Sequence, residues 1–222
     1  MRRRDLLALI AAVAAAPGAA LADDQHVALA KAFPMLAQYL GVPPAERSRF
    51  YLSYRTVRDK RPVSDAKGAI VGAGPPVPLA LDRAGIVTHL PTLAELKGPG
   101  ELVMQGQPFK LGLELRCAMA PSTHIDPAQL EAALVQVNAA VAKIAGAMAV
   151  MIPKLTAAFF PDSGGGHALF ADGHQTALPV FAAPIVGPVP FFEPAKAAGA
   201  KTVVLAKAPS RILLGGHPKG AA

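Results

Sequence analysis

The chain has 222 residues, 52% of them hydrophobic and 17% charged, and its formal net charge is +7. Its one cysteine, Cys117, excludes an internal disulfide, so packing must stabilise the fold even in an oxidising compartment. The roughly 200 residues that follow an N-terminal leader-like segment are enough for one domain with a sizeable core. We therefore expect a single domain over residues 23–222, with two closely packed halves as the alternative.

Residues 1–22 have the three-part pattern of an export signal. Three arginines at positions 2–4 precede an apolar stretch over residues 6–21, and Ala20 and Ala22 flank Leu21 in an A-x-A arrangement. We expect cleavage after Ala22, which removes three Arg and one Asp and lowers the formal charge from +7 to +5. The stretch is too short and too rich in alanine for a lasting transmembrane anchor, so we expect none in the mature chain.

Within this segment, Arg3-Arg4-Asp5-Leu6-Leu7 resembles the twin-arginine export consensus, in which two arginines precede any residue and then two bulky apolar residues. The resemblance covers these residues alone, and general secretory export is the alternative. It implies a periplasmic or secreted protein that folds before it crosses the membrane. Such a route permits a cofactor loaded in the cytoplasm but does not require one, and we expect none.

In the first half of the chain, helical spacing over residues 25–40 predicts an N-terminal helix that Pro34 interrupts. Alternation of apolar and polar residues predicts two strands, a third is expected at residues 101–105, and two apolar runs around Asp82-Arg83-Ala84-Gly85 predict a hairpin. The strands cover residues 50–57, 101–105 and 109–117, and the hairpin runs 77–81 and 86–90. Cys117 continues the alternation of Leu111, Leu113 and Leu115, so we expect it to face the core.

The clearest helix covers residues 127–150. Asp126 is positioned to cap it, Pro127 takes the first helical position, and one stripe combines Leu130, Leu134, Val137, Val141, Ile144 and Met148. We expect Pro153 to bend or end this helix. Its many alanines favour close packing on a sheet face, and the lysines within residues 139–160 favour a core helix over a membrane span.

The second half of the chain predicts further strands. Asp172-Gly173 is a strong turn signal between residues 168–171 and 174–178, and a last pair of strands is expected at 202–206 and 211–214. Five prolines in residues 179–194 predict an extended apolar arm on the surface instead of a central strand. Strands separated by one long helix predict an α+β fold with mostly antiparallel sheets.

Motifs for catalysis and metal binding are not evident. The six histidines lack metal-ligand spacing, and pairing of Ala171 with His174 would place His167 roughly 13 Å from that turn. Ser163 lacks a nucleophile elbow, and the glycines at 164–166 lack the Lys and Ser or Thr of a phosphate loop, so a flexible connector is expected there. We predict no catalytic or metal-binding residue.

The strongest charge asymmetry lies in residues 47–61, where basic side chains alternate with aromatic ones. The candidate ligand-binding residues are Arg49, Tyr51, Arg55, Arg58 and Arg61, and Arg47 and Lys60 belong to the same cluster. Export argues against nucleic acid and favours an anionic envelope component or an acidic partner protein. The alternative is an edge strand whose charges prevent strand pairing.

Two functions follow from these observations. The first is a non-catalytic envelope protein that binds an anionic ligand or partner through the basic strand and the proline-rich apolar arm. The second is a twin-arginine-exported enzyme of the hydrolase class. The absence of recognisable catalytic spacing favours the first without excluding the second, because distant residues can also assemble a site.

Overall fold

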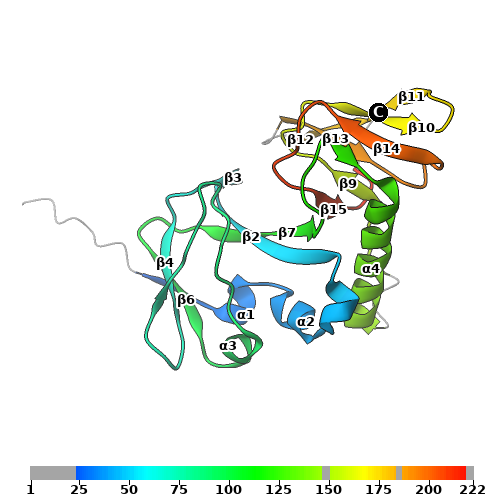
Figure 1. The fold of residues 1–222 in the computed structure, drawn as a ribbon. Coiled ribbons are helices and arrows are strands. Elements are labelled where there is room, and N and C mark those ends of the chain that lie inside the picture. Colours follow the sequence, from blue (N-terminus) through cyan, green and yellow to red (C-terminus); the bar gives the residue numbers. More distant parts are fainter. Residues whose placement is uncertain (1–23, 147–150, 184–186, 219–222) are drawn as a thin grey trace, which may run out of the picture.

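The computed structural model describes residues 24–146, 151–183 and 187–218. Its fold is mixed and rich in sheet, with one long helix, α4 (Pro127–Ala145), against antiparallel sheets (Figure 1). This agrees with the expected α+β class. The predicted export signal, with Arg3, Arg4, Leu6, Leu7, Ala20 and Ala22, lies outside the described residues.

The N-terminal half contains a four-stranded sheet with three short α-helices beside it. The strand order is β1 (Gln25–Ala28), β6 (Glu101–Gln105), β4 (Lys67–Val71) and β5 (Val77–Pro78). The helices are α1 (Leu29–Ala32), α2 (Leu36–Gly41) and α3 (Leu93–Lys97), and a 3-10 turn, η1 (Pro44–Arg47), follows α2.

A seven-stranded sheet joins the two halves. Its order is β12 (Val180–Ala183), β13 (Gly187–Phe192), β9 (Ala157–Phe159), β15 (Leu213–Gly215), β7 (Lys110–Cys117), β2 (Phe50–Arg58) and β3 (Arg61–Pro62). A third sheet has the order β11 (Gln175–Ala177), β10 (Gly166–Phe170), β14 (Ala200–Leu205) and β8 (His124–Ile125). In Figure 1 the long β2–β7 pair extends from the N-terminal half towards the strands of the C-terminal half.

The β2–β7 pair follows the alternation of its sequence. Phe50, Leu52, Tyr54 and Thr56 are buried on one face, while Tyr51 and Arg55 belong to the other face. Cys117 pairs with Phe50 and is buried, as predicted, and burial raises the pKa of its thiol. β2 is also contacted along part of its second edge, where β3 pairs with it and Thr56 N donates to Gly85 O at 2.8 Å. The alternative of a free edge protected by charges therefore does not describe β2.

The start of α4 is as predicted, whereas its end is not. The Asp126 carboxylate accepts from Ala128 N at 2.9 Å, Pro127 occupies the first turn, and Leu130, Leu134 and Val137 are buried. The helix ends at Ala145 because Gly146 adopts a φ of 54°, so neither residue 150 nor Pro153 sets its end. Met148 lies outside the described residues.

Asn138 ties α4 to the segment that leads into β9. Its side-chain amide donates to Leu155 O at 2.8 Å and accepts from Leu155 N at 2.9 Å. It also donates to Leu134 O at 2.7 Å. The side chain thus satisfies both backbone groups of one residue outside any sheet ladder.

The N-terminal segment differs from the predicted helix. Residues 25–28 form β1 and pair with β6, and the following helices α1 and α2 are separated around Pro34. The break at Pro34 was predicted, but the strand was not, because its four residues carry no clear alternation. Tyr54 stabilises the break by donating from its hydroxyl to Pro34 O at 2.6 Å.

The turn of the first predicted hairpin is present, but residues 77–81 and 86–90 do not form the expected pair of strands: β5 pairs with β4, and the two runs share only an isolated bridge between Leu81 and Val87. Asp82 N donates to Ile86 O at 2.9 Å, and the Asp82 carboxylate accepts from the amides of Ala84 and Ile86. Gly85 has a φ of 74°, and a Cβ at this position would overlap the Val63 carbonyl oxygen. Glycine is therefore required where this turn reaches β2.

The second hairpin is also present, but its predicted register is wrong by one residue. Phe170 N donates to His174 O, so Phe170 and not Ala171 faces His174, and three residues form the loop. Gly173 has a φ of 86° in that loop. The last two strands are not partners either, because β14 pairs with β10 and β8 whereas β15 pairs with β7 and β9.

The proline-rich segment 179–194 forms the β12–β13 hairpin and not a surface arm. Val189, Phe191 and Phe192 are buried, and β13 pairs with both β12 and β9. Pro188 and Pro190 occupy alternate positions of β13, so their missing N–H groups face one edge only. The amides of the alternate residues Val189 and Phe191 face the other edge, and Phe191 N donates to Pro179 O there at 3.0 Å.

Candidate functional site: a basic-rimmed pocket

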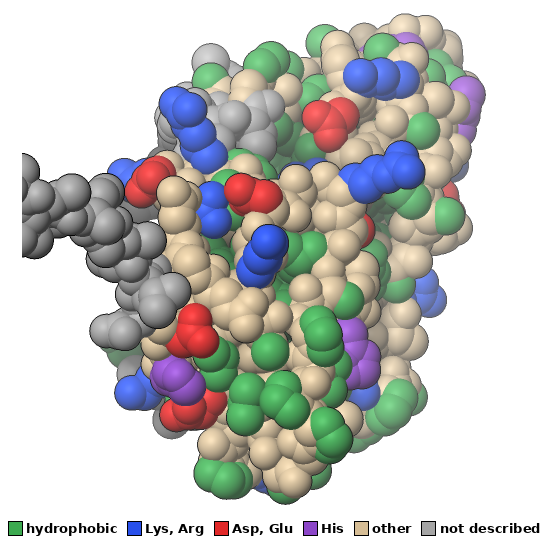
Figure 2. Space-filling model, turned by 90° about the vertical axis from the view of Figure 1, so that its left-hand side faces the viewer, with side chains coloured by type: hydrophobic (Ala, Val, Ile, Leu, Met, Phe, Trp, Pro, Cys, Tyr) green, Lys and Arg blue, Asp and Glu red, His purple; other side chains and the backbone are tan. Residues whose placement is uncertain are grey.

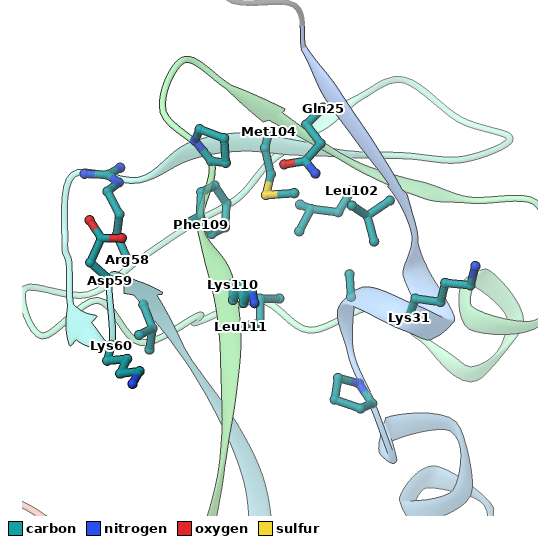
Figure 3. Close-up of a pocket in the computed structure, with 15 residues that line it drawn as sticks. Gln25, Lys31, Arg58, Asp59, Lys60, Leu102, Met104, Phe109, Lys110 and Leu111 are labelled. Carbon is teal, nitrogen blue, oxygen red and sulfur yellow. The ribbon is translucent and has the colours of Figure 1, made fainter.

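A pocket of about 660 Å³ lies in the N-terminal half, between the β1–α1 segment and the β2–β3 turn. Figure 3 shows Arg58, Asp59 and Lys60 on one side of it, Gln25 and Lys31 on the other, and Leu102, Met104 and Phe109 between them. This volume falls within the range of small-molecule binding sites. We call it the basic-rimmed pocket.

The lining of the pocket is largely apolar. Its hydrophobic members come from β1, from β6 and from the start of β7, and they include Val27, Leu102, Met104, Pro108, Phe109 and Leu111. β6 supplies Leu102 and Met104 from one face because residues two apart in a strand point the same way. Such a lining favours an aliphatic or aromatic portion in any bound molecule.

The charged members of the lining are mostly positive. Four cations, from Lys31, Arg58, Lys60 and Lys110, stand against one carboxylate, that of Asp59. Arg58 also lies 3.4 Å from the exposed Asp65 carboxylate, and its Nε is buried without a hydrogen-bond partner. The pocket therefore combines an apolar lining with an excess of positive charge, which favours an anionic group beside an apolar one.

The turn that carries part of this rim has an unusual backbone. Asp59 and Lys60 have φ values of 49° and 64° in a two-residue turn between the paired residues Arg58 and Arg61. Positive φ at both central residues defines a type I′ turn, for which Asn-Gly and Asp-Gly are the favoured sequences. Lysine at the second position is strained, and strained residues occur most often at functional sites.

The basic cluster predicted from residues 47–61 is divided among several places. Arg58 and Lys60 line the pocket, whereas Arg61 is exposed on β3. Arg55 and Tyr51 lie on the outer face of β2, and Arg55 Nε donates to a Glu114 carboxylate oxygen at 2.8 Å. Arg49 precedes β2, where its backbone N donates to Gln136 Oε1 at 2.7 Å.

These residues do not merge into one large positive surface. On the face drawn in Figure 2, Lys and Arg side chains are interspersed with acidic ones, and hydrophobic side chains gather in the lower part. Arg47 instead stacks over the ring of Tyr39, with 4.6 Å from its guanidinium carbon to the ring centroid. A broad electrostatic surface is thus a weaker description of the site than the pocket.

Sequence reasoning missed Lys31, Lys110 and the apolar lining. Lys110 lies outside the basic cluster of residues 47–61, and its pairing with Val57 brings it beside the β2–β3 turn. That register and the position of β1 depend on long-range pairing, which periodicity does not encode. Lys31 lies in a predicted helical segment and gave no separate signal.

Among the described residues, no three His, Cys, Asp or Glu side chains group closely enough to hold a metal ion. Ser163 is fully buried, and its hydroxyl donates to Phe160 O at 2.9 Å. His174 Nδ1 lies 2.6 Å from the Asp172 carboxylate on an exposed turn. His167 lies on β10 and pairs with Ala177 of β11.

A separate ionic cluster surrounds Glu193, which is only 7% exposed. Its carboxylate lies 2.8 Å from Lys196 Nζ and 3.0 Å from His217 Nδ1. Burial raises the pKa of Glu193, but the hydrogen bonds from Lys196 and His217 outweigh that effect and lower the pKa below its ordinary value of 4.5. This cluster ties residue 217 to the end of β13.

Comparison of the chain with models of protein families, with curated proteins and with solved structures gave no match. In the part of the chain that the structure describes, no helix has the length and apolar character needed to cross a membrane. The function must therefore be argued from the site itself.

Proposed function

We propose that this protein is an exported, non-catalytic binding protein of the cell envelope and that its ligand is an anionic amphiphile. The observation that carries the proposal is the basic-rimmed pocket, in which four cations and one carboxylate surround an apolar lining. The apolar lining contributes through burial of hydrocarbon, and the cations select a negative headgroup.

This ligand class explains more of the pocket than the other candidates. An acidic polysaccharide would use the cations and leave the apolar lining without a partner. A neutral lipid would use the lining and leave the cations unused. An acidic segment of a partner protein remains the alternative, provided that it also carries an apolar side chain for the pocket.

The hydrolase alternative lacks an arrangement that favours it within the described residues. Ser163, the serine considered in the sequence, is buried and bonded to the backbone. We therefore keep binding as the proposed function.

The test is isothermal titration of the mature protein with dodecyl phosphate and, separately, with dodecyl maltoside, each below its micellar concentration. We expect dodecyl phosphate to bind and its affinity to fall as salt rises, because rim charges near the surface are screened. Replacement of Arg58, Lys60 and Lys110 by Gln should weaken the binding of dodecyl phosphate about tenfold, from roughly 0.5 kcal/mol for each of the three charges.

The matched control replaces two exposed lysines of the C-terminal half, Lys201 and Lys207, by Gln. It should leave the affinity unchanged. Equal binding of both amphiphiles, insensitive to the rim variant, would refute charge selection, and binding of neither would refute the pocket as the site. Binding of an acidic apolar peptide alone would favour the partner-protein alternative.

Export is a separate part of the proposal with its own measurement. N-terminal sequencing of protein recovered from the periplasm should begin at Asp23. Replacement of Arg3 and Arg4 by Lys should stop export if the twin-arginine route is used, and undiminished export would favour the general secretory route.

A further inference from the structure

A second group of cationic side chains lies away from the pocket, on the face of the seven-stranded sheet opposite Phe50, Leu52 and Tyr54. Arg55 comes from β2, Arg116 and Glu114 come from β7, and Arg211 lies just before β15. The register brings them together, because Ser53 pairs with Glu114 and Leu213 pairs with Arg116. We call these three arginines and Glu114 the arginine cluster.

Glu114 is the centre of the cluster. Its Oε1 accepts from Arg55 Nε at 2.8 Å, and its Oε2 accepts from Arg116 Nε and Nη2 at 3.0 and 2.8 Å. Arg211 Nε lies 3.3 Å from the same Oε2. The four side chains are only 12–14% exposed, so water screens them poorly.

The charges of the cluster do not balance. Three guanidinium groups surround one carboxylate, and Asp162, an exposed residue, acts on Arg211 as a further negative charge. Burial lowers the pKa of Arg211, and the positive charges of Arg55 and Arg116 lower it further. Positive charge that is largely buried is costly unless anions neutralise it.

Hydrogen-bond donors are also left over. Arg55 Nη2 is buried without a hydrogen-bond partner, and Arg211 Nε, although 3.3 Å from Glu114 Oε2, makes no hydrogen bond. Ser53, directly opposite Glu114, is 4% exposed, and its hydroxyl is likewise without a partner. Glu114 already accepts three hydrogen bonds, so it cannot serve all the remaining donors.

The chemistry of these donors and their access to solvent favour an oxyanion as their ligand. Guanidinium groups bind tetrahedral oxyanions and carboxylates through paired N–H donors, and an oxyanion also accepts from a hydroxyl. Tyr51 pairs with Arg116 on the same face and is 41% exposed, so the Arg116 end of the cluster lies near solvent. An anion can therefore approach from that end.

We propose that the arginine cluster binds a tetrahedral oxyanion of the phosphate or sulfate class, with Arg55, Arg116 and Arg211 as its ligands and Ser53 as an additional donor. This site is distinct from the basic-rimmed pocket and does not depend on the function proposed for that pocket. The oxyanion is either a free ion or the phosphate group of a larger ligand.

The first measurement is the melting temperature of the mature protein in sodium phosphate and in sodium sulfate, each against sodium chloride of equal ionic strength. We expect a rise of about 3–6 °C at an oxyanion concentration ten times the dissociation constant. Absence of any oxyanion-specific rise in the wild type would overturn the proposal.

The decisive variant is Arg211→Gln. If the cluster binds an oxyanion, this change removes the rise while leaving the melting temperature in chloride unchanged or higher, because it relieves repulsion among the arginines. If the cluster is only structural, the variant melts lower in every salt and the response to phosphate equals that of the wild type. Arg211→Lys keeps the charge but loses the planar pair of donors, and it should restore only part of the rise.

Ser53→Ala is the second variant, since it removes one donor without changing any charge. It should reduce the phosphate response and keep the fold if Arg211→Gln proves unstable. Titration of both variants with inorganic phosphate and with dodecyl phosphate separates the two sources of the oxyanion. Loss of phosphate binding with retained dodecyl phosphate binding assigns the amphiphile to the pocket, whereas loss of both assigns its headgroup to the arginine cluster.

Discussion

Replacement of Lys60 by Gly should make the protein more stable and, at the same time, weaken its binding of anions. Lys60 has a φ of 64° and follows Asp59 in the type I′ turn. A left-handed backbone costs an L-residue other than glycine about 1–2 kcal/mol. Glycine loses more chain entropy on folding, by roughly 0.5–1 kcal/mol, so we expect a net stabilisation of about 0.5–1 kcal/mol.

Urea unfolding, followed by circular dichroism, measures this change, and the melting temperature should rise by about 1–4 °C. Lys207→Gly is the matched control, because Lys207 is exposed and its backbone is not in the left-handed region. It should lose about 0.5–1 kcal/mol through chain entropy alone. Destabilisation of Lys60→Gly to the same extent as the control would refute the strain in the turn.

Three further predictions concern other parts of the fold. Gly85→Ala should lower the free energy of unfolding by about 3 kcal/mol, because the new Cβ would overlap the Val63 carbonyl. Gly106 has a similar φ of 73° but open space around it, so Gly106→Ala should lower the free energy of unfolding by only about 1 kcal/mol. Equal losses in urea unfolding would contradict the overlap. Asn138→Ala should cost about 2 kcal/mol, since it removes hydrogen bonds from helix and strand segments alike, and a loss below 0.5 kcal/mol by the same assay would argue against that tie. Because the pKa of Glu193 is lowered in the folded state, its stabilising contribution is present above pH 4.5 and is lost as the pH falls through the folded-state pKa. The stability difference between the wild type and Glu193→Gln should therefore shrink below pH 4.5. A constant difference across about pH 3–6 would be the contrary result.

The elements that could be predicted were those set by local chemistry. The start of α4 followed from Asp126 and Pro127, and β2 and β7 followed from alternation over five or more residues. These signals act within a few positions of the chain. The folded structure keeps these elements because tertiary packing favours the same local conformations.

The elements that could not be predicted depend on distant partners. β1 is a strand because β6 pairs with it, and β13 is internal because the prolines leave one edge of amides intact. Both outcomes need the partner strand to be known, which periodicity does not supply. The one-residue error at the second hairpin arose because Gly173 serves a three-residue loop as well as it serves a two-residue turn.

The candidate sites were predictable in kind but not in place. A concentration of arginines in residues 47–61 indicated an anionic ligand, yet Arg58 and Arg55 belong to different sites. Arg116 and Arg211 lie outside residues 47–61, and the pairing of Leu213 with Arg116 brings them together. Three strands from distant parts of the sequence assemble the arginine cluster, so no short motif could reveal it.

The position of β15 between β7 and β9 has a consequence for how the protein forms during synthesis. Leu213 pairs with Arg116 on one side and with Phe159 on the other, about 100 residues after β7 leaves the ribosome. At ordinary translation rates, β15 is synthesised on the order of 5–20 s after β7, and until then the second edge of β7 is unpaired. During that interval the nascent chain exposes an open strand edge, which is a template for aggregation and for chaperones.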